Sequence, residues 1–148
     1  MKGFKFRLQT VLEAKEQKFK DSQLEYAKVQ SRLYREKQAL ETMYNEHSKT
    51  NEGLEQIIKS GLMDYTQIAC HQNYLLKLKG DIQYQHNLIG RIEMELAEKK
   101  RLMLEAMKEK KIMEKLRERA LEEFKKNVDR QEFITIDEIA TNRYKKAS

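Results

Sequence analysis

The residues of this chain that could do chemistry are few, and their spacing fits no metal or nucleophilic centre. Cys70 and His71 are sequence neighbours, so on a helix their side chains point about 100° apart. His47 and His86 stand at no spacing that zinc ligands use. We therefore expect no metal site and no cofactor, and a lone cysteine cannot form an internal disulfide.

Phosphate-binding loops are also missing from the sequence. Neither G-x-x-x-x-G-K-S/T nor G-x-G-x-x-G occurs, so we expect no bound nucleotide and no enzyme. Basic runs at 99–101 and 108–111 raise the question of nucleic-acid binding, but acidic residues interrupt them and no stacking aromatic residues stand among them. We interpret these runs as solvated helix faces and expect no nucleic acid, with contact to an anionic membrane surface as the better alternative.

The composition is that of a helical rod rather than a compact enzyme. The 148 residues are 39% hydrophobic and 36% charged, with no proline and five glycines. Little therefore interrupts a helical backbone, and we predict that well over half of the chain is helix. No apolar run approaches the roughly 20 residues that cross a bilayer, and no secretion signal is evident, so we expect a soluble cytoplasmic protein.

The net charge of +6 is spread unevenly along the chain. Residues 1–20 carry six basic and two acidic side chains, and residues 98–119 carry nine basic and five acidic ones. Residues 41–74 instead carry two basic and five acidic side chains. If the chain folds back at its middle, the two basic segments meet at one end of the rod and the acidic segment caps the other.

The elements that must position these charges are two helices with a seven-residue apolar repeat. Alternating spacings of three and four residues place such side chains on one helix face, and two such faces wind around each other as a coiled coil. The first stripe is Leu12, Phe19, Tyr26, Leu33, Leu40, His47 and Leu54, and the second is Leu75, Ile82, Ile89, Leu96 and Met103, with Leu78, Ile92, Ala106 and Met113 three residues on.

One chain therefore carries both halves of a helical pair, and we predict an all-α fold: a long antiparallel two-helix coiled-coil hairpin with a C-terminal overhang. It is a single domain over 1–148, with helix one at about 8–58, a turn at about 59–64 and helix two at about 65–132. Asp64 and Gln67 form a weak capping box at the start of helix two. The pairing places Leu33 near Ile92. We interpret His47 as a polar core residue that sets the register, and Lys15 and Glu36 interrupt the core track.

The same pairing predicts the overhang. The start of helix one pairs with about residue 119 of helix two, so the residues of helix two after 119 have no partner on helix one. Leu121, Phe124 and Val128 lie beyond that point on one helical face, with nothing in the chain to cover them. Such a face indicates an external binding surface or self-association. Further on, the β-branched residues at 133–136 leave two alternatives: a break followed by a short helix at about 136–145, or a continuous helix.

Four segments of the chain resemble the FliJ family of flagellar export proteins. They are Phe4-Lys5-Phe6-Arg7-Leu8-Gln9-Thr10-Val11-Leu12; Gly61-Leu62 with Asn73-Tyr74-Leu75 and Leu78; Lys111-Ile112-Met113-Glu114-Lys115-Leu116; and Asp137-Glu138-Ile139-Ala140 with Arg143. Their order and spacing are more specific than any one of them. The resemblance implies that the protein is a component of the flagellar type III export apparatus. It also implies a shape similar to the stalk of rotary ATPases and a location at the cytoplasmic face of the cell membrane.

The resemblance also implies the partners: the hexameric export ATPase, the cytoplasmic part of an export-gate membrane protein, and export chaperones. For the ATPase ring we expect a surface at the open end of the hairpin, made of Lys5, Arg7, Lys108, Lys110, Lys111, Leu121, Phe124 and Val128. For the gate or chaperones, the family pattern of an aromatic residue with a leucine four positions later falls on Tyr74 and Leu78, and a poorer match falls on Tyr44 and His47.

Two alternatives stay open from the sequence. The aromatic ring of Tyr74 could simply flank the core, and the whole chain could be an unrelated cytoplasmic coiled-coil scaffold or a membrane-surface tether. The protein alone is expected to be a monomer, because two linked helices meet at a higher effective concentration than two separate chains.

Overall fold

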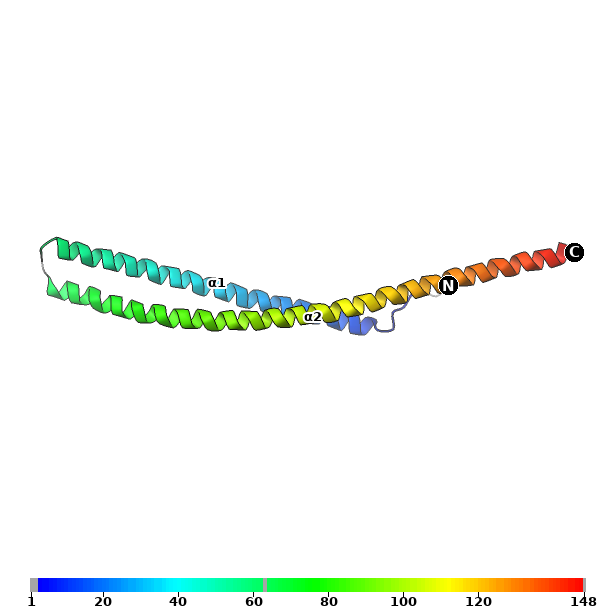
Figure 1. Cartoon of the computed structure of the whole chain (residues 1–148), viewed down its shortest axis with the longest axis horizontal. Helices are drawn as coiled ribbons and strands as arrows, with labels where there is room; N and C mark the ends of the chain where they lie inside the picture. Colours follow the sequence, from blue (N-terminus) through cyan, green and yellow to red (C-terminus); the bar gives the residue numbers. More distant parts are fainter. Residues whose placement is uncertain (1–2, 63, 148) are drawn as a thin grey trace. The chain divides into compact units, whose positions relative to one another are not determined.

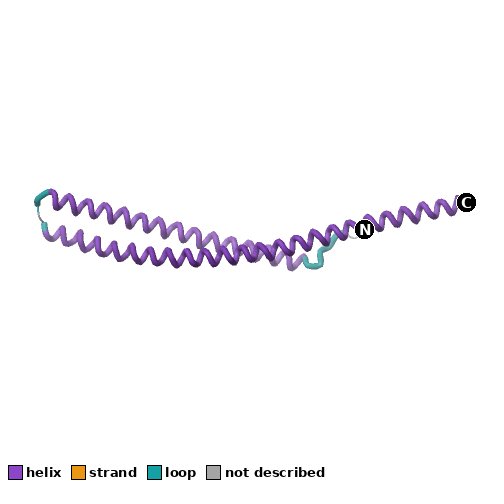
Figure 2. The backbone as a smooth tube through the Cα atoms, viewed as in Figure 1, coloured by secondary structure: helices purple, strands orange, loops and turns teal. Residues whose placement is uncertain are grey.

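The computed structural model describes residues 3–62 and 64–147, which form two long α-helices and no strand (Figures 1 and 2). Helix α1 spans Gln9–Lys59 and helix α2 spans Tyr65–Ala147. The predicted all-α two-helix hairpin is thereby confirmed. Residue 63 of the predicted turn, and residues 1, 2 and 148 of the predicted single domain, lie outside the described residues.

The turn between the helices is built by a glycine and an aspartate. Gly61 has a φ of 72°, a left-handed backbone conformation that costs glycine little and other residues more. The Asp64 carboxylate accepts hydrogen bonds from the backbone N–H of Thr66, at 3.1 Å, and of Gln67, at 3.4 Å. Asp64 therefore caps α2 as expected, since it satisfies amide donors that have no partner within the helix.

The chain divides into two compact units, which are described separately: residues 22–103 form one unit, and the residues up to 21 together with those from 104 onward form the other. In the first unit, which we call the turn unit, α1 and α2 run antiparallel and side by side up to the turn (Figure 1). Its core is a cluster of Val29, Leu33, Ile89 and Ile92. Leu33 and Ile92 thus meet as the heptad register predicted.

Ion pairs across the turn unit follow the same antiparallel register. Arg32 pairs with Glu95, and Lys37 Nζ lies 3.7 Å from a carboxylate oxygen of Glu93. These side chains flank the apolar core and remain about half exposed. Each such pair stabilises the fold little, so the core cluster carries the packing and the ion pairs fix which residues face each other.

In the second unit, which we call the termini unit, the start of α1 packs on the later part of α2. Leu12, Ala106 and Met113 are buried there. Glu109 accepts hydrogen bonds from the ammonium groups of Lys15, at 3.1 Å, and Lys18, at 3.2 Å. These two bonds, together with the positive charges, hold the pKa of the Glu109 carboxyl below its ordinary value. Lys15, which interrupts the core track, therefore has an acidic partner across the pair.

Helix α2 does not end at about residue 132. It continues to Ala147, so the alternative with a break and a separate helix at about 136–145 is wrong. The Thr135 hydroxyl donates to the carbonyl of Gln131, and the Thr141 hydroxyl donates to that of Asp137, each at 2.9 Å. These bonds lie within the helix, and the segment contains neither glycine nor proline, so β-branching alone does not interrupt it.

Candidate binding surfaces

The apolar face at Leu121, Phe124 and Val128 is partly covered by the chain itself. Residues 3–8 form a non-helical segment before α1, which we call the strap (Figure 2). The ring of Phe4 on the strap lies 5.6 Å from the ring of Phe124, centroid to centroid. All three α2 residues are half-buried. The expectation that nothing in the chain covers this face is therefore wrong. The heptad repeat predicts only contacts between helices, so it could not predict a contact with a non-helical segment.

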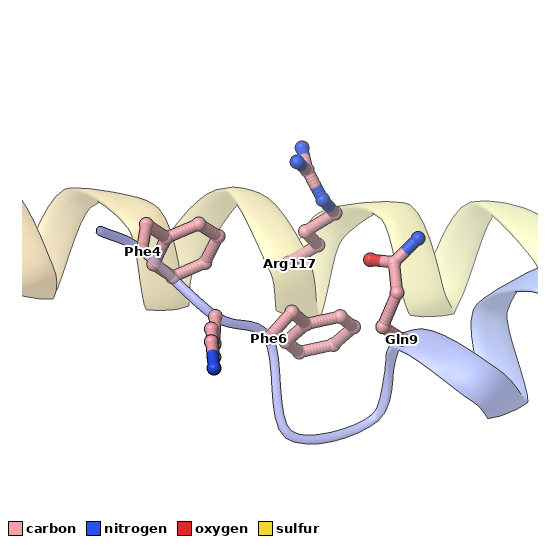
Figure 3. A pocket seen from close by; sticks show the side chains of 5 residues that line it. Phe4, Phe6, Gln9 and Arg117 are labelled. Atoms are coloured by element: carbon pink, nitrogen blue, oxygen red, sulfur yellow. The ribbon is translucent and has the colours of Figure 1, made fainter. Parts of the chain in front are cut away.

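The strap also brings positive charge to α2. The Arg117 guanidinium lies 5.7 Å from the centre of the Phe4 ring, within the range of a cation–π contact. Figure 3 shows Phe4 and Phe6 of the strap alongside Arg117 of α2, where with Lys5 and Gln9 they line a shallow hollow. Along the strap, half-buried phenylalanines alternate with the exposed Lys5 and Arg7. An extended chain points successive side chains to opposite sides, which explains the alternation.

The predicted basic residues of α2 differ in their exposure and in their contacts with other side chains. Lys108 and Lys111 are exposed and have no acidic partner among the described residues. Lys110 is half-buried instead: its ammonium lies 5.0 Å from the centre of the Phe19 ring and 3.4 Å from a Glu114 oxygen. The structure therefore gives Lys110 a packing role, whereas Lys108 and Lys111 are exposed to solvent.

Exposed apolar residues continue along α2 beyond the predicted face at Leu121, Phe124 and Val128. Phe133 is 72% exposed, Ile136 66% and Tyr144 78%. Every described residue after Val128 is exposed. For 133–136 the β-branched residues left two alternatives, a break or a continuous helix. The apolar residues at 133, 136, 140 and 144 have helical spacing, and that spacing was the signal for a continuous helix with an uncovered face.

The residues expected at the export gate do not form one cluster. The hydroxyl of Tyr44 lies 2.6 Å from Nε2 of His86, whereas the hydroxyl of Tyr74 donates to a Glu46 oxygen at 2.6 Å. In the heptad of α1, Tyr44 precedes the core residue His47 by three positions, and Glu46 precedes it by one. The two hydrogen-bonded pairs therefore flank the core of the turn unit on opposite sides.

The other two expected gate residues lie deeper in the turn unit. Leu78 is only 4% exposed and belongs to the core, while His47 is half-buried between the helices. His47 lines a hollow with Tyr44, and Leu78 lines a different hollow with Tyr74. The hydrogen bond to Glu46, whose negative charge disfavours the phenolate, raises the pKa of Tyr74 above its ordinary value.

No group of three or more histidine, cysteine, aspartate or glutamate side chains that could hold a metal ion occurs among the described residues. Cys70 is exposed, and Nδ1 of His71 lies 2.8 Å from the backbone oxygen of Gln67. The His71 ring is thus bonded within its own helix. In the described part of the chain, neither α1 nor α2 contains a stretch long and apolar enough to cross a membrane.

Comparison with known proteins shows that a protein-family model matches this chain. The model of the family described as "Flagellar FliJ protein" matches residues 4–148, which is nearly the whole chain. No curated protein and no solved structure matches. The match covers both units and includes the strap from Phe4 onward.

Proposed function

Because the chain belongs to the FliJ family of flagellar proteins, we propose that it acts as a stalk or adaptor that promotes the assembly and activity of the hexameric export ATPase. The family membership makes the chain a component of the flagellar export apparatus and removes the alternative of an unrelated scaffold. A stalk or adaptor protein acts by binding its partners, so its function depends on its binding surfaces.

The observation that carries the proposal is the composite surface of the termini unit. The strap packs Phe4 on Phe124 and presents Lys5 and Arg7, while α2 of the same unit exposes Lys108 and Lys111. Cations without acidic partners attract a partner of opposite charge, and the apolar face provides the area that holds it. We assign the termini unit to the ATPase ring, with Leu121 and Val128 beside Phe124.

For the export gate and the chaperones we propose the flanks of the turn unit. Tyr44 and Tyr74 are 48% and 39% exposed, so each offers an aromatic surface with a polar tip. His47 and Leu78 support these rings from the core side. Because Tyr44 and Tyr74 lie on opposite flanks, two partners could bind the turn unit without competing for the same aromatic residue.

The ATPase assignment predicts a specific effect of charge reversal. Lys108→Glu with Lys111→Glu is expected to slow association with the export ATPase hexamer about three- to tenfold at low salt and to flatten the salt dependence, because long-range attraction governs encounter rates. Surface plasmon resonance over a salt series measures both quantities. Lys110 is left intact because its contacts with Phe19 and Glu114 would confound the result.

A matched control reverses two cations of the turn unit. Lys49 and Arg91 are exposed and have no ion-pair partner among the described residues, so Lys49→Glu with Arg91→Glu changes the net charge equally. The control should associate at nearly the parent rate. If both double variants slowed association to the same extent, net charge rather than the termini unit would steer the encounter, and the assignment would fail.

A further inference from the structure

We propose that polar residues on the core tracks form a pairing code, which directs α1 to α2 and prevents the α1 helices of two copies from pairing in parallel. The code goes beyond the proposed function, because it concerns the choice between antiparallel and parallel pairing of the helices. In the turn unit its members are Glu36 in α1, and Gln85 and Lys99 in α2. Each stands where the heptad repeat calls for an apolar residue.

The central member is a hydrogen-bonded polar layer inside the hairpin. Gln85 is 5% exposed, and its side-chain amide donates to the backbone oxygen of Glu36 at 2.9 Å and to the Glu36 carboxylate at 2.6 Å. No buried side-chain nitrogen or oxygen in the described part of the chain lacks a partner. The layer is therefore satisfied in the antiparallel pairing, and only a donor opposite Glu36 satisfies it.

Lys99, a second charged residue on the core tracks of this unit, is matched in the same way. The Lys99 ammonium lies 3.9 Å from a Glu25 oxygen across the helix pair. In the termini unit, considered by itself, Lys15 of α1 likewise meets Glu109 of α2. Every one of these polar core positions thus faces a residue of opposite charge or complementary hydrogen bonding on the other helix.

The charged residues that flank the core of the turn unit support the same choice. With Leu33 at heptad position a, Arg32 is a g residue that pairs with the g residue Glu95, and Lys37 is an e residue that pairs with the e residue Glu93. Pairing of like positions, g with g and e with e, is the arrangement of antiparallel helices. Parallel helices instead bring g of one helix to e of the next heptad on the other.

Parallel pairing of two copies of α1 would turn these matches into repulsions. Glu36 would face Glu36 of the second copy inside the interface, and Arg32 would face Lys37 across its edge. Like charges that lose water without gaining a partner are strongly unfavourable. A domain-swapped dimer, in which α1 of one copy pairs with α2 of another, keeps every antiparallel match, so the code opposes only the parallel pairing.

A buried cysteine reports the parallel pairing in the full-length chain. Val29 is 4% exposed on the core track, where in a parallel α1 pair it would face its own copy. The reporter chain carries Cys70→Ser, which removes the exposed native thiol, and Val29→Cys. In a glutathione buffer, a 29–29 disulfide between chains forms only if two α1 helices align in parallel. A hairpin or a swapped dimer instead places this cysteine against α2.

Three variants of the reporter chain test the code. Adding Glu36→Leu should increase the disulfide-linked dimer about tenfold or more, because a Leu pair replaces a Glu pair and Gln85 loses its carboxylate acceptor. Adding Glu36→Gln should increase it several-fold with little change in melting temperature, because the amide keeps the bond to Gln85 and loses only the charge. The control is Glu41→Leu, which makes the same chemical change at an exposed position of the same helix.

Each outcome decides the matter. A rise with both changes at Glu36 and none with Glu41→Leu supports the code. Dimer levels equal to the control for both Glu36 variants would overturn it, since the linked hairpin would then exclude parallel pairs without help from Glu36. A rise for Glu36→Leu alone would also overturn it, because added apolar surface would explain the result without charge. Circular dichroism of each variant shows whether the helices are intact, and Glu36→Gln remains decisive if the leucine variant misfolds.

Discussion

Replacing Leu33 or Ile92 with alanine is expected to lower the free energy of unfolding by about 2–4 kcal/mol, the usual cost of removing a large apolar side chain from a core. Leu33 is 8% exposed and Ile92 only 3%, and they belong to one cluster with Val29 and Ile89. A two-helix hairpin has no second layer that could close over the gap. Little relaxation can therefore offset the lost packing.

Urea unfolding followed by circular dichroism measures this cost, with Lys100→Ala as the surface control. Lys100 is exposed on α2, so its replacement should change the free energy of unfolding by less than about 0.5 kcal/mol. Comparable losses for all three alanine variants would mean that Leu33 and Ile92 are not core residues. The heptad register, and with it the opposition of Glu36 to Gln85, would then be wrong.

Phe124→Ala is expected to weaken binding to the export ATPase by about 1–2 kcal/mol, seen mainly as faster dissociation, because an aromatic anchor contributes to holding a complex more than to its encounter. The same change removes the ring on which Phe4 packs. Since Phe124 is only half-buried, the free energy of unfolding should fall much less than in Leu33→Ala.

The matched control for Phe124→Ala is Tyr84→Ala, which removes an aromatic ring that is 63% exposed in the turn unit. Dissociation of the ATPase should be unchanged by it. The opposite pattern would refute the assignment: if Phe124→Ala destabilised the isolated protein as much as Leu33→Ala while ATPase binding stayed normal, the strap contact would serve folding alone.

The helical architecture was predictable because its causes are periodic and local. The seven-residue stripes placed Leu33 against Ile92, and the chemistry of Asp64 placed the start of α2. What the repeat could not reveal was the strap, because Phe4 reaches Phe124 from outside any helix and over a large sequence separation. Contacts of that kind depend on tertiary packing. They produce no repeating pattern in a single sequence, so they could not be predicted from it.

The candidate surfaces were predictable only in part. Residue type identified the cations, but whether a cation is free depends on its neighbours: Lys110 has Phe19 and Glu114 beside it, and Lys111 stands clear. Likewise, the family pattern marked Tyr74 and Leu78 together, yet a core position buries Leu78 and leaves only Tyr74 accessible. Position in the heptad decided accessibility in both cases.

Site-specific photo-crosslinking most directly tests the assignment of the termini unit to the export ATPase. A photoreactive amino acid replaces Lys111 in one chain and Lys59, the exposed last residue of α1, in another. Each chain is irradiated with the ATPase hexamer under identical conditions. Our account predicts a crosslinked product from position 111 and none above background from position 59. A product from position 59 with none from position 111 would contradict it, because the ATPase would then contact the turn instead.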